Sequence, residues 1–123
     1  MELGDQPLES GEPAGYCPSF QHAIELIGRR WTGSILRAVG EHALRFGEIR
    51  SAVPGLSDRL LDARLTELES EGILSRSKNH GEVRYSATPI GVDLMPVLHA
   101  IDSWSQKHSS LTPPLERPGR RRC

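Results

Sequence analysis

The sequence predicts a mostly α (α+β) fold, a winged helix-turn-helix with one additional helix at each end, and three neighbouring observations predict it. A well-capped amphipathic helix spans residues 57–71. A shorter helical segment and a Pro-Gly turn stand directly before it, and two strand-like segments joined by a turn stand directly after it. A helix-turn-helix followed at once by a β-hairpin is the order of elements in a winged helix.

The helix over 57–71 has marked ends and one apolar side. Leu61, Leu65 and Leu68 fall at i, i+4 and i+7, which places them in one stripe. Ser57 is a good N-cap because its hydroxyl can accept a hydrogen bond from an N–H of the first turn. Gly72 tolerates the positive φ with which many helices end.

The opposite side of this helix is short or polar. Arg59, Ala63 and Thr66 point away from the leucines, with Asp62 at the flank. A helix that enters the major groove of DNA needs small residues for close approach and one or two long donors for base edges. An ordinary solvated face has the same composition and is the simpler interpretation for this helix alone.

The segments on either side favour the DNA interpretation. Residues 46–53 form a helical pattern with Phe46, Ile49 and Val53 inward, preceded by an extended piece at 43–45. Residues 73–78 and 82–87 are strand-like, and 79–81 form a hairpin turn. The hairpin carries Arg76, Lys78, His80 and Arg84, so its tip is basic. Such a wing can lie along a phosphate backbone or reach a minor groove, although by itself it could be a plain surface hairpin.

Two further helices are predicted before these elements. Pro18 opens the first, over 18–27, whose apolar stripe is Phe20, Ala23, Ile24 and Ile27. The second begins at Trp31, which is expected in the core, and closes at Gly40. Its inward residues are Ile35, Leu36 and Val39.

The last helix begins with Thr88 as N-cap and Pro89 at its first position, and Pro96 should bend it. Its broad apolar surface consists of Leu94, Met95, Val97, Leu98, Ala100, Ile101 and Trp104. This surface exceeds what one small core needs, so we expect the first and last helices to be dimerisation helices. The alternative is that the last helix packs only on its own domain.

Charge and composition bound the domain organisation. Residues 1–16 carry four acidic and no basic side chains, whereas residues 17–108 carry 11 of each sign. We expect residues 1–15 to be a disordered acidic arm, 16–108 the folded domain and 109–123 a disordered Pro- and Arg-rich tail. No apolar run is long enough for a membrane span and no signal peptide is present, which predicts a cytoplasmic protein.

Ten motifs, in order along the chain, resemble the HxlR family of winged-helix transcriptional regulators, which are MarR-like in architecture. They are CP (17–18), LIGRRWT (26–32), IL (35–36), RFGEIR (45–50), PGLS (54–57), RLTEL (64–68), EGI (71–73), VRY (83–85), TPIG (88–91) and LMPVL (94–98). The resemblance implies a homodimer on a pseudo-palindromic DNA operator, with helix 57–71 in the major groove and the wing beside it. The wing is shorter than is usual in the family and lacks the prolines often found there.

Eleven residues are candidates for DNA contact. Arg59 is the expected base reader, because a guanidinium can donate two hydrogen bonds to guanine. Ser57, Asp62, Ala63 and Thr66 complete the groove face. The phosphate candidates are Arg45, Arg50, Arg64, Arg76, Lys78 and Arg84. Arg64 could equally form an ion pair with Glu67 or Glu71.

Cys17 suggests an input signal, because a helix N-terminus stabilises a thiolate and raises its reactivity. Several members of the family sense oxidants or electrophiles through a cysteine at this place; an inert cysteine is the alternative. A small-molecule effector at the dimer interface, or a winged-helix protein-interaction module without DNA specificity, are competing functions. No phosphate loop, metal-ligand spacing or nucleophile–base pair is present, so we expect no enzyme, metal or cofactor.

Overall fold

The computed structural model describes residues 15–40 and 42–108 of the 123-residue chain. The predicted acidic arm, apart from Gly15, and the predicted tail at 109–123 lie outside the described residues. The chain divides into two compact units, the first ending at Gly33 and the second beginning at Ser34.

The first unit contains helix α2 (Pro18–Ile27) and the turn that leads into α3 (Thr32–Val39). Sequence analysis placed Trp31 at the start of the second helix and in the core, and both expectations were wrong. Trp31 has φ +76°, is only partly buried, and has the Arg30 guanidinium 5.3 Å from its ring centroid. A left-handed residue cannot continue a right-handed helix, so α3 begins one residue later, at Thr32.

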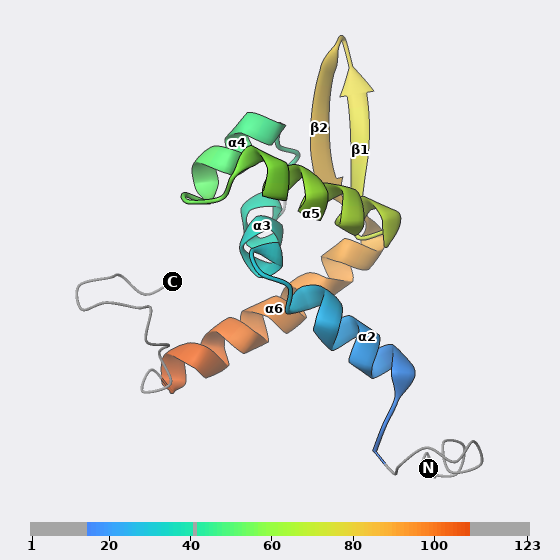
Figure 1. Ribbon diagram of the computed structural model, residues 1–123, viewed down its shortest axis with the longest axis vertical. Helices are drawn as coiled ribbons and strands as arrows, with labels where there is room; N and C mark the ends of the chain where they lie inside the picture. Colours follow the sequence, from blue (N-terminus) through green and yellow to red (C-terminus); the bar gives the residue numbers. More distant parts are fainter. Residues whose placement is uncertain (1–14, 41, 109–123) are drawn as a thin grey trace. The chain divides into compact units, whose positions relative to one another are not determined.

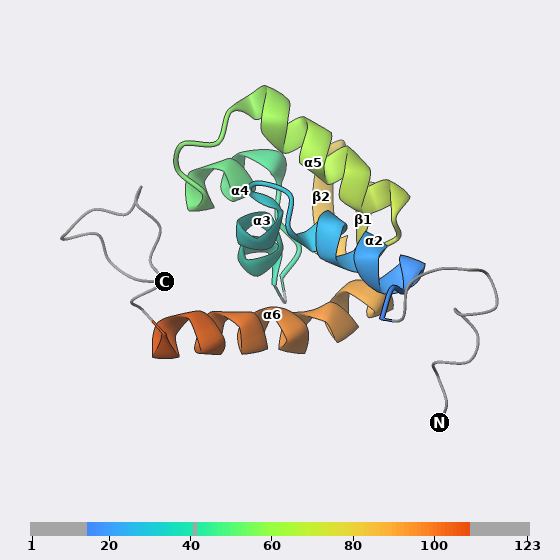
Figure 2. The same ribbon diagram turned by 60° about the horizontal axis from the view of Figure 1, so that its bottom comes forward.

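The second unit stacks three helices around one core. It contains most of α3, then α4 (Phe46–Ala52), α5 (Asp58–Ser70), the hairpin β1–β2 and α6 (Pro89–Lys107). Figures 1 and 2 both show α3 lying between α5 and α6. The most deeply buried apolar side chains of the second unit are Ile35, Leu36, Val39, Ile49, Leu61, Leu65, Leu68 and Leu74. The inward residues predicted for α3 and α5 are therefore confirmed, whereas Phe46 of α4 is only partly buried.

Helix α5 begins and ends as its sequence predicts. The Ser57 hydroxyl accepts a hydrogen bond from the Leu60 N–H at 3.1 Å. At the other end Gly72 has φ +78°, its N–H bonds the Glu69 carbonyl at 3.0 Å, and the Ile73 N–H bonds the Leu68 carbonyl at 2.9 Å. This pair of hydrogen bonds is the Schellman arrangement, which turns the chain directly from α5 into the hairpin.

The hairpin is antiparallel, with β1 (Leu74–Asn79) paired to β2 (Glu82–Ala87). Asn79 pairs with Glu82, so the turn consists of His80 and Gly81, which both have positive φ, as a type I′ turn requires. The predicted extended piece at 43–45 pairs with β2 through one antiparallel bridge. The N–H and carbonyl of Leu44 exchange hydrogen bonds of 2.9 and 2.8 Å with Tyr85. Together these elements confirm the winged helix-turn-helix.

Helix α6 starts against the end of α5. The Thr88 hydroxyl accepts from the Gly91 N–H at 3.1 Å, and it lies within hydrogen-bonding reach of the Gly72 and Ile73 carbonyls. The helix continues through Pro96, and the bend expected there stays a prediction. Of its apolar residues Leu98 is buried, whereas Ile101 and Trp104 are exposed.

We expect Gly91→Ala to lower the free energy of unfolding by about 1–3 kcal/mol, because overpacking forces neighbouring groups to move. An added Cβ would lie against the Ile73 carbonyl oxygen, closer than real Cβ atoms come, and that oxygen belongs to the backbone. Chemical denaturation at one fixed protein concentration measures the change.

Gly47→Ala is the matched control. Gly47 is also in the first turn of a helix, but nothing lies within 4 Å of its added Cβ. Alanine there should leave stability unchanged or raise it by up to about 1 kcal/mol. Equal effects of the two substitutions would contradict the packing argument.

Candidate nucleic-acid interface

The outer side of α5 is exposed, as the sequence predicts. The five residues proposed for the groove face all have exposed side chains: Ser57, Arg59, Asp62, Ala63 and Thr66. Leu61, Leu65 and Leu68 on the opposite side are at most 1 % exposed and fix the orientation of the helix. Within the described residues, Arg59 takes part in no ion pair, and in particular in none with Asp62. The guanidinium of Arg59 therefore projects from the first turn of α5 with its donors available.

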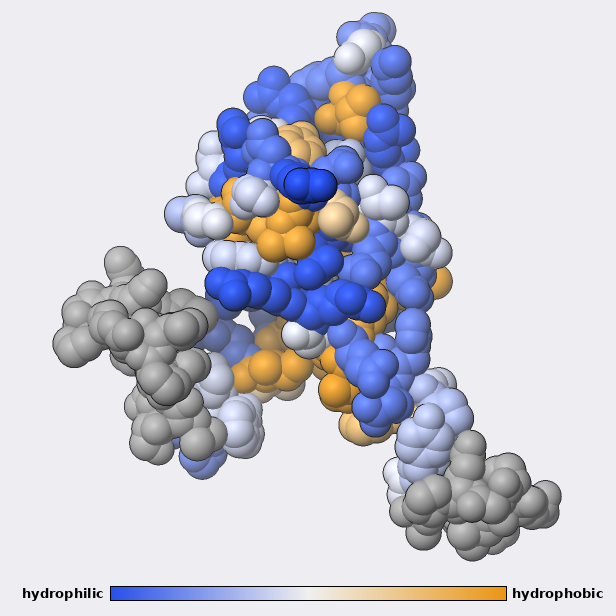
Figure 3. Space-filling view, viewed as in Figure 1, coloured by the Kyte–Doolittle hydropathy of each residue, from blue (hydrophilic) through white to orange (hydrophobic). Residues whose placement is uncertain are grey.

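The wing adds two further cationic side chains that have no ion-pair partner among the described residues. Arg76 and Lys78 stand two residues apart on β1, so they share one face of the hairpin, and both are exposed. Neither is in an ion pair with another described residue. Figure 3 shows the surface of the hairpin as mostly hydrophilic.

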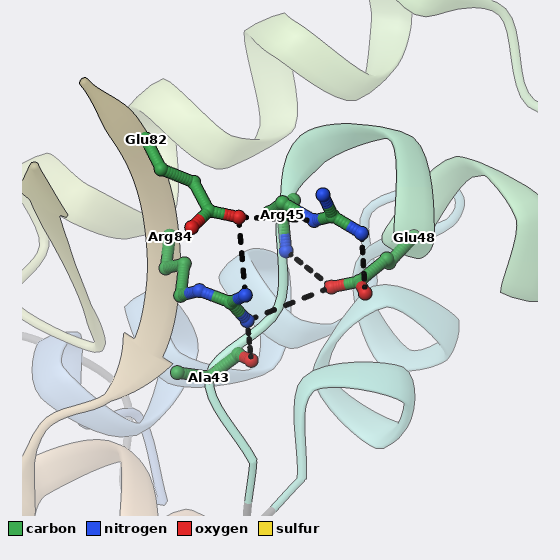
Figure 4. A network of polar contacts seen from close by, with 5 residues as sticks. All are labelled: Ala43, Arg45, Glu48, Glu82 and Arg84. Atoms are coloured by element: carbon green, nitrogen blue, oxygen red, sulfur yellow. Dashed lines mark hydrogen bonds and ion pairs between the residues drawn. The ribbon is translucent and has the colours of Figure 1, made fainter. Parts of the chain in front are cut away.

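Arg84 differs from these two cations. It pairs with Ser77 across the hairpin, so it lies on the other face, and it is partly buried. Figure 4 shows it in a network with Arg45, Glu48 and Glu82. Its guanidinium donates to the Glu82 carboxylate at 3.1 Å and to the Ala43 carbonyl at 3.1 Å.

Arg45 completes this network from the residue before α4. Its guanidinium bonds Glu48 at 3.1 Å and lies 3.4 Å from Glu82, and its backbone N–H donates to Glu48 at 2.8 Å. The Glu48 carboxylate also lies 3.9 Å from Arg84. Two arginines and two glutamates thus join the start of α4 to β2, and their formal charges cancel.

The remaining two phosphate candidates are also paired. Arg50 of α4 bonds Asp58 in the first turn of α5 at 3.0 Å, which links the two helices of the helix-turn-helix. Arg64 lies 3.8 Å from Glu67, the partner that its spacing suggested. Sequence reasoning missed the roles of Glu48, Asp58 and Glu82. Only Glu48 had a readable signal, because a glutamate three residues after a helix N-cap commonly bonds the cap N–H.

The arginine contacts change the protonation of Glu48. Its pKa lies below the ordinary value because the Arg45 backbone N–H donates to the carboxylate, and the Arg45 guanidinium then adds a second hydrogen bond and its charge. The pKa of Arg45 is raised in turn by its hydrogen bond and charge interaction with Glu48. Both shifts favour the charged forms of Glu48 and Arg45.

The profile of the family described as HxlR-like helix-turn-helix matches residues 26–112, which is most of the chain. The chain belongs to the HxlR-like helix-turn-helix family. Its relatives in this family are helix-turn-helix transcriptional regulators, and this chain is a transcriptional regulator of that type.

Three relatives illustrate the HxlR-like likeness. The regulator YvaP of Bacillus subtilis is 37% identical over 92 residues, covering 72% of this chain and 85% of YvaP. The reduced form of YodB from Bacillus subtilis superposes with a TM-score of 0.70 at 32% identity, covering 75% of this chain and 93% of that one. YodB has also been solved after diamide treatment and bound to quinone. The redox regulator HypR in its reduced form gives a TM-score of 0.71 at 28% identity, covering 76% of this chain and 95% of that one.

Two other classes of site were sought within the described ranges 15–40 and 42–108. They contain no cluster of three or more histidine, cysteine or carboxylate side chains that could hold a metal ion. None of the helices there combines the length and hydropathy needed to cross a membrane.

The Glu48 carboxyl should titrate below the ordinary glutamate value of 4.5, and Arg45→Met should raise its pKa only part of the way back, because the backbone N–H remains. Since the folded-state pKa is the lowered one, the stabilisation is complete above the ordinary value and is lost as pH falls through the lowered value. Carbon-detected NMR of the Glu48 side chain measures both values. The cause that we assign would be wrong if wild type and Arg45→Met titrated together.

Proposed function

We propose that this regulator binds a pseudo-palindromic DNA operator as a homodimer, with the outer face of α5 in the major groove and the wing along the adjacent backbone. One observation supports this most directly. The face of α5 that carries Arg59, Ala63 and Thr66 is exposed, and the exposed wing adds Arg76 and Lys78. Small residues allow close approach of the helix, and the unpaired cations supply donors to bases and phosphates.

Each groove residue has a role that its chemistry permits. Arg59 donates two hydrogen bonds to guanine, a contact worth about 1–3 kcal/mol of discrimination. Thr66 and Ser57 offer hydroxyl groups, although the Ser57 oxygen already accepts from Leu60 and would act as a donor. Asp62 can accept from cytosine, and Ala63 leaves room for the groove wall.

The phosphate candidates divide by their pairing. Arg76 and Lys78 contact phosphates directly in this proposal. Arg45, Arg50, Arg64 and Arg84 each have a carboxylate neighbour, so a phosphate would have to compete with that partner. Each of these four is therefore expected to contribute less to phosphate binding than Arg76 or Lys78 for as long as its carboxylate partner is in place.

The homodimer is supported by an apolar stripe on α6 that faces away from its own core. Ile90, Val97, Ile101 and Trp104 follow one another at spacings of seven, four and three residues, and their exposed fractions lie between 47 and 62 %. Leu98, on a neighbouring side of the helix, is buried. A second copy of the chain would cover the exposed stripe. Phe20 and Ile24 of α2 are exposed as well, at 63 and 46 %, as the expected role of α2 as a second dimerisation helix requires.

A redox input through Cys17 is the second part of the proposal. Cys17 is the N-cap of α2, its side chain is exposed, and the first turn of α2 contains no acidic residue. Its sulfur lies 3.4 Å from the Ser19 hydroxyl oxygen, a hydrogen-bonding distance. All four features favour the thiolate, the last of them when the Ser19 hydroxyl is the donor. The solved forms of YodB and HypR, which include diamide-treated, quinone-bound and oxidised states, make a thiol-reactive signal a reasonable input.

DNA selected by the purified protein should contain two half-sites about one helical turn, roughly 34–36 Å, apart. Arg59→Ala should relax the base preference in each half-site more than it weakens binding to random DNA. Arg76→Ala is the control, since loss of a phosphate contact should weaken binding to all sequences alike. Quantitative sequencing of bound DNA separates the two effects.

The DNA proposal fails if the wild-type protein shows neither sequence preference nor salt-dependent binding. A protein-interaction module would then be the better interpretation. A single half-site bound by one subunit would instead reject the homodimer.

Cys17→Ser should abolish a loss of operator affinity that diamide causes in the wild-type protein, while leaving the affinity of the reduced protein unchanged. Binding is measured with and without diamide, and again after addition of a reductant. Ser19→Ala, which keeps the thiol but removes its neighbouring hydroxyl, is the matched control and should still respond. If Cys17→Ser responds as wild type does, Cys17 is not the sensor.

A further inference from the structure

The two arginines in the network between α4 and β2 differ from Arg59, Arg76 and Lys78 because they are paired with carboxylates. Arg45, Glu48, Arg84 and Glu82 alternate in sign, and each arginine contacts both glutamates. Figure 4 shows dashed contacts from each of the two arginine side chains to both glutamates. Arg59, Arg76 and Lys78 have no such partner among the described residues, so the basic residues of the interface form two classes.

The position of the network matters because it attaches the wing nearer its turn than the Leu44–Tyr85 bridge does. A two-stranded hairpin is only marginally stable by itself. The wing is attached by the Leu44–Tyr85 bridge near the middle of β2, and Tyr85 is buried there. Glu82 lies at the first position of β2, nearer the turn, and contacts Arg45 directly before α4. The network therefore ties the outer half of the wing to the helix-turn-helix.

We propose that Glu48 and Glu82 are positioning residues for DNA recognition, which fix the wing relative to α5 and hold Arg45 and Arg84 away from DNA phosphates. This inference rests on the proposed DNA-binding function. Both glutamates act through the arginines and touch no DNA themselves.

The proposal has a thermodynamic consequence that a purely structural role would not produce. A guanidinium released from its carboxylate can reach a phosphate and displace a counterion from the DNA. Each added phosphate contact steepens the dependence of log K on log salt by about 0.9. Because the new contact is sequence-independent, it raises affinity for random DNA and lowers the ratio of operator to random binding.

The test compares Glu82→Gln and Glu48→Gln with wild type on the selected operator and on random DNA, over a range of salt concentrations. We expect each substitution to steepen the salt dependence by about one and to lower the operator-to-random ratio several-fold. All four side chains are at least 38 % exposed, so the variants should fold, and thermal unfolding checks this.

Two matched variants separate the proposed mechanism from a simple change of charge. Glu69→Gln also removes one negative charge, from an exposed side chain near the end of α5, and should leave the slope and ratio close to wild type. Placing Glu82→Gln in an Arg45→Gln, Arg84→Gln background removes the cations through which Glu82 acts. The effect of Glu82→Gln should then disappear.

Two negative results are distinguishable. If wild type shows no salt-dependent, sequence-selective binding, the proposed function itself fails. If wild type binds but Glu82→Gln and Glu48→Gln match Glu69→Gln, or if their effect persists without the two arginines, the positioning role alone is overturned.

Discussion

The end of α5, the start of the wing and the start of α6 are linked at one junction, where the Ile73 carbonyl meets the first turn of α6. Ile73 follows Gly72, whose positive φ ends α5, and Leu74 then begins β1. The Ile73 carbonyl accepts from the Thr88 N–H at 3.0 Å, and Gly91 packs against the same oxygen without a Cβ. Three elements therefore leave this point in directions that cannot change independently, because interiors of this kind are close-packed.

Charge placement, rather than total charge, distinguishes the DNA face. The formal net charge of the chain is −1, which offers no long-range attraction to DNA. Ion pairing further reduces the number of cationic side chains available to DNA, because Arg45, Arg50 and Arg84 all lie against carboxylates. A binding protein of this kind would rely less on non-specific attraction and more on the few unpaired donors, which favours selectivity over affinity.

The sequence predicted most of the fold because its signals are local. The leucine stripe, the Ser57 cap and Gly72 all lie between residues 57 and 72, and the structure confirms each of them. The fold class followed from the order of such elements. Trp31 was misplaced because its left-handed backbone overrides the apolar pattern on which the helix prediction depended.

The site was less predictable because pairing between distant elements has no sequence period. Arg59, Ala63 and Thr66 could be assigned to the outer face from helical geometry alone. That Arg45 and Arg84 share Glu82 depends on the Leu44–Tyr85 bridge, which brings residues about forty positions apart into contact. Sequence reasoning therefore counted these two arginines with the unpaired cations of the wing, from which the structure separates them.

The same junction connects the proposed dimer surface on α6 to α5, the helix proposed to enter the major groove. The outward stripe of α6 begins at Ile90, beside Gly91, so a partner bound along α6 is held close to the point from which α5 departs. In a symmetric dimer, the angle between the two copies of α6 would set the separation of the two α5 helices. Because the junction allows little independent movement, a small rotation at the dimer contact would be carried to both groove faces rather than absorbed between them. In the proposed dimer, regulation would act through a rotation between the subunits, with α5, the wing and α6 of each copy moving together.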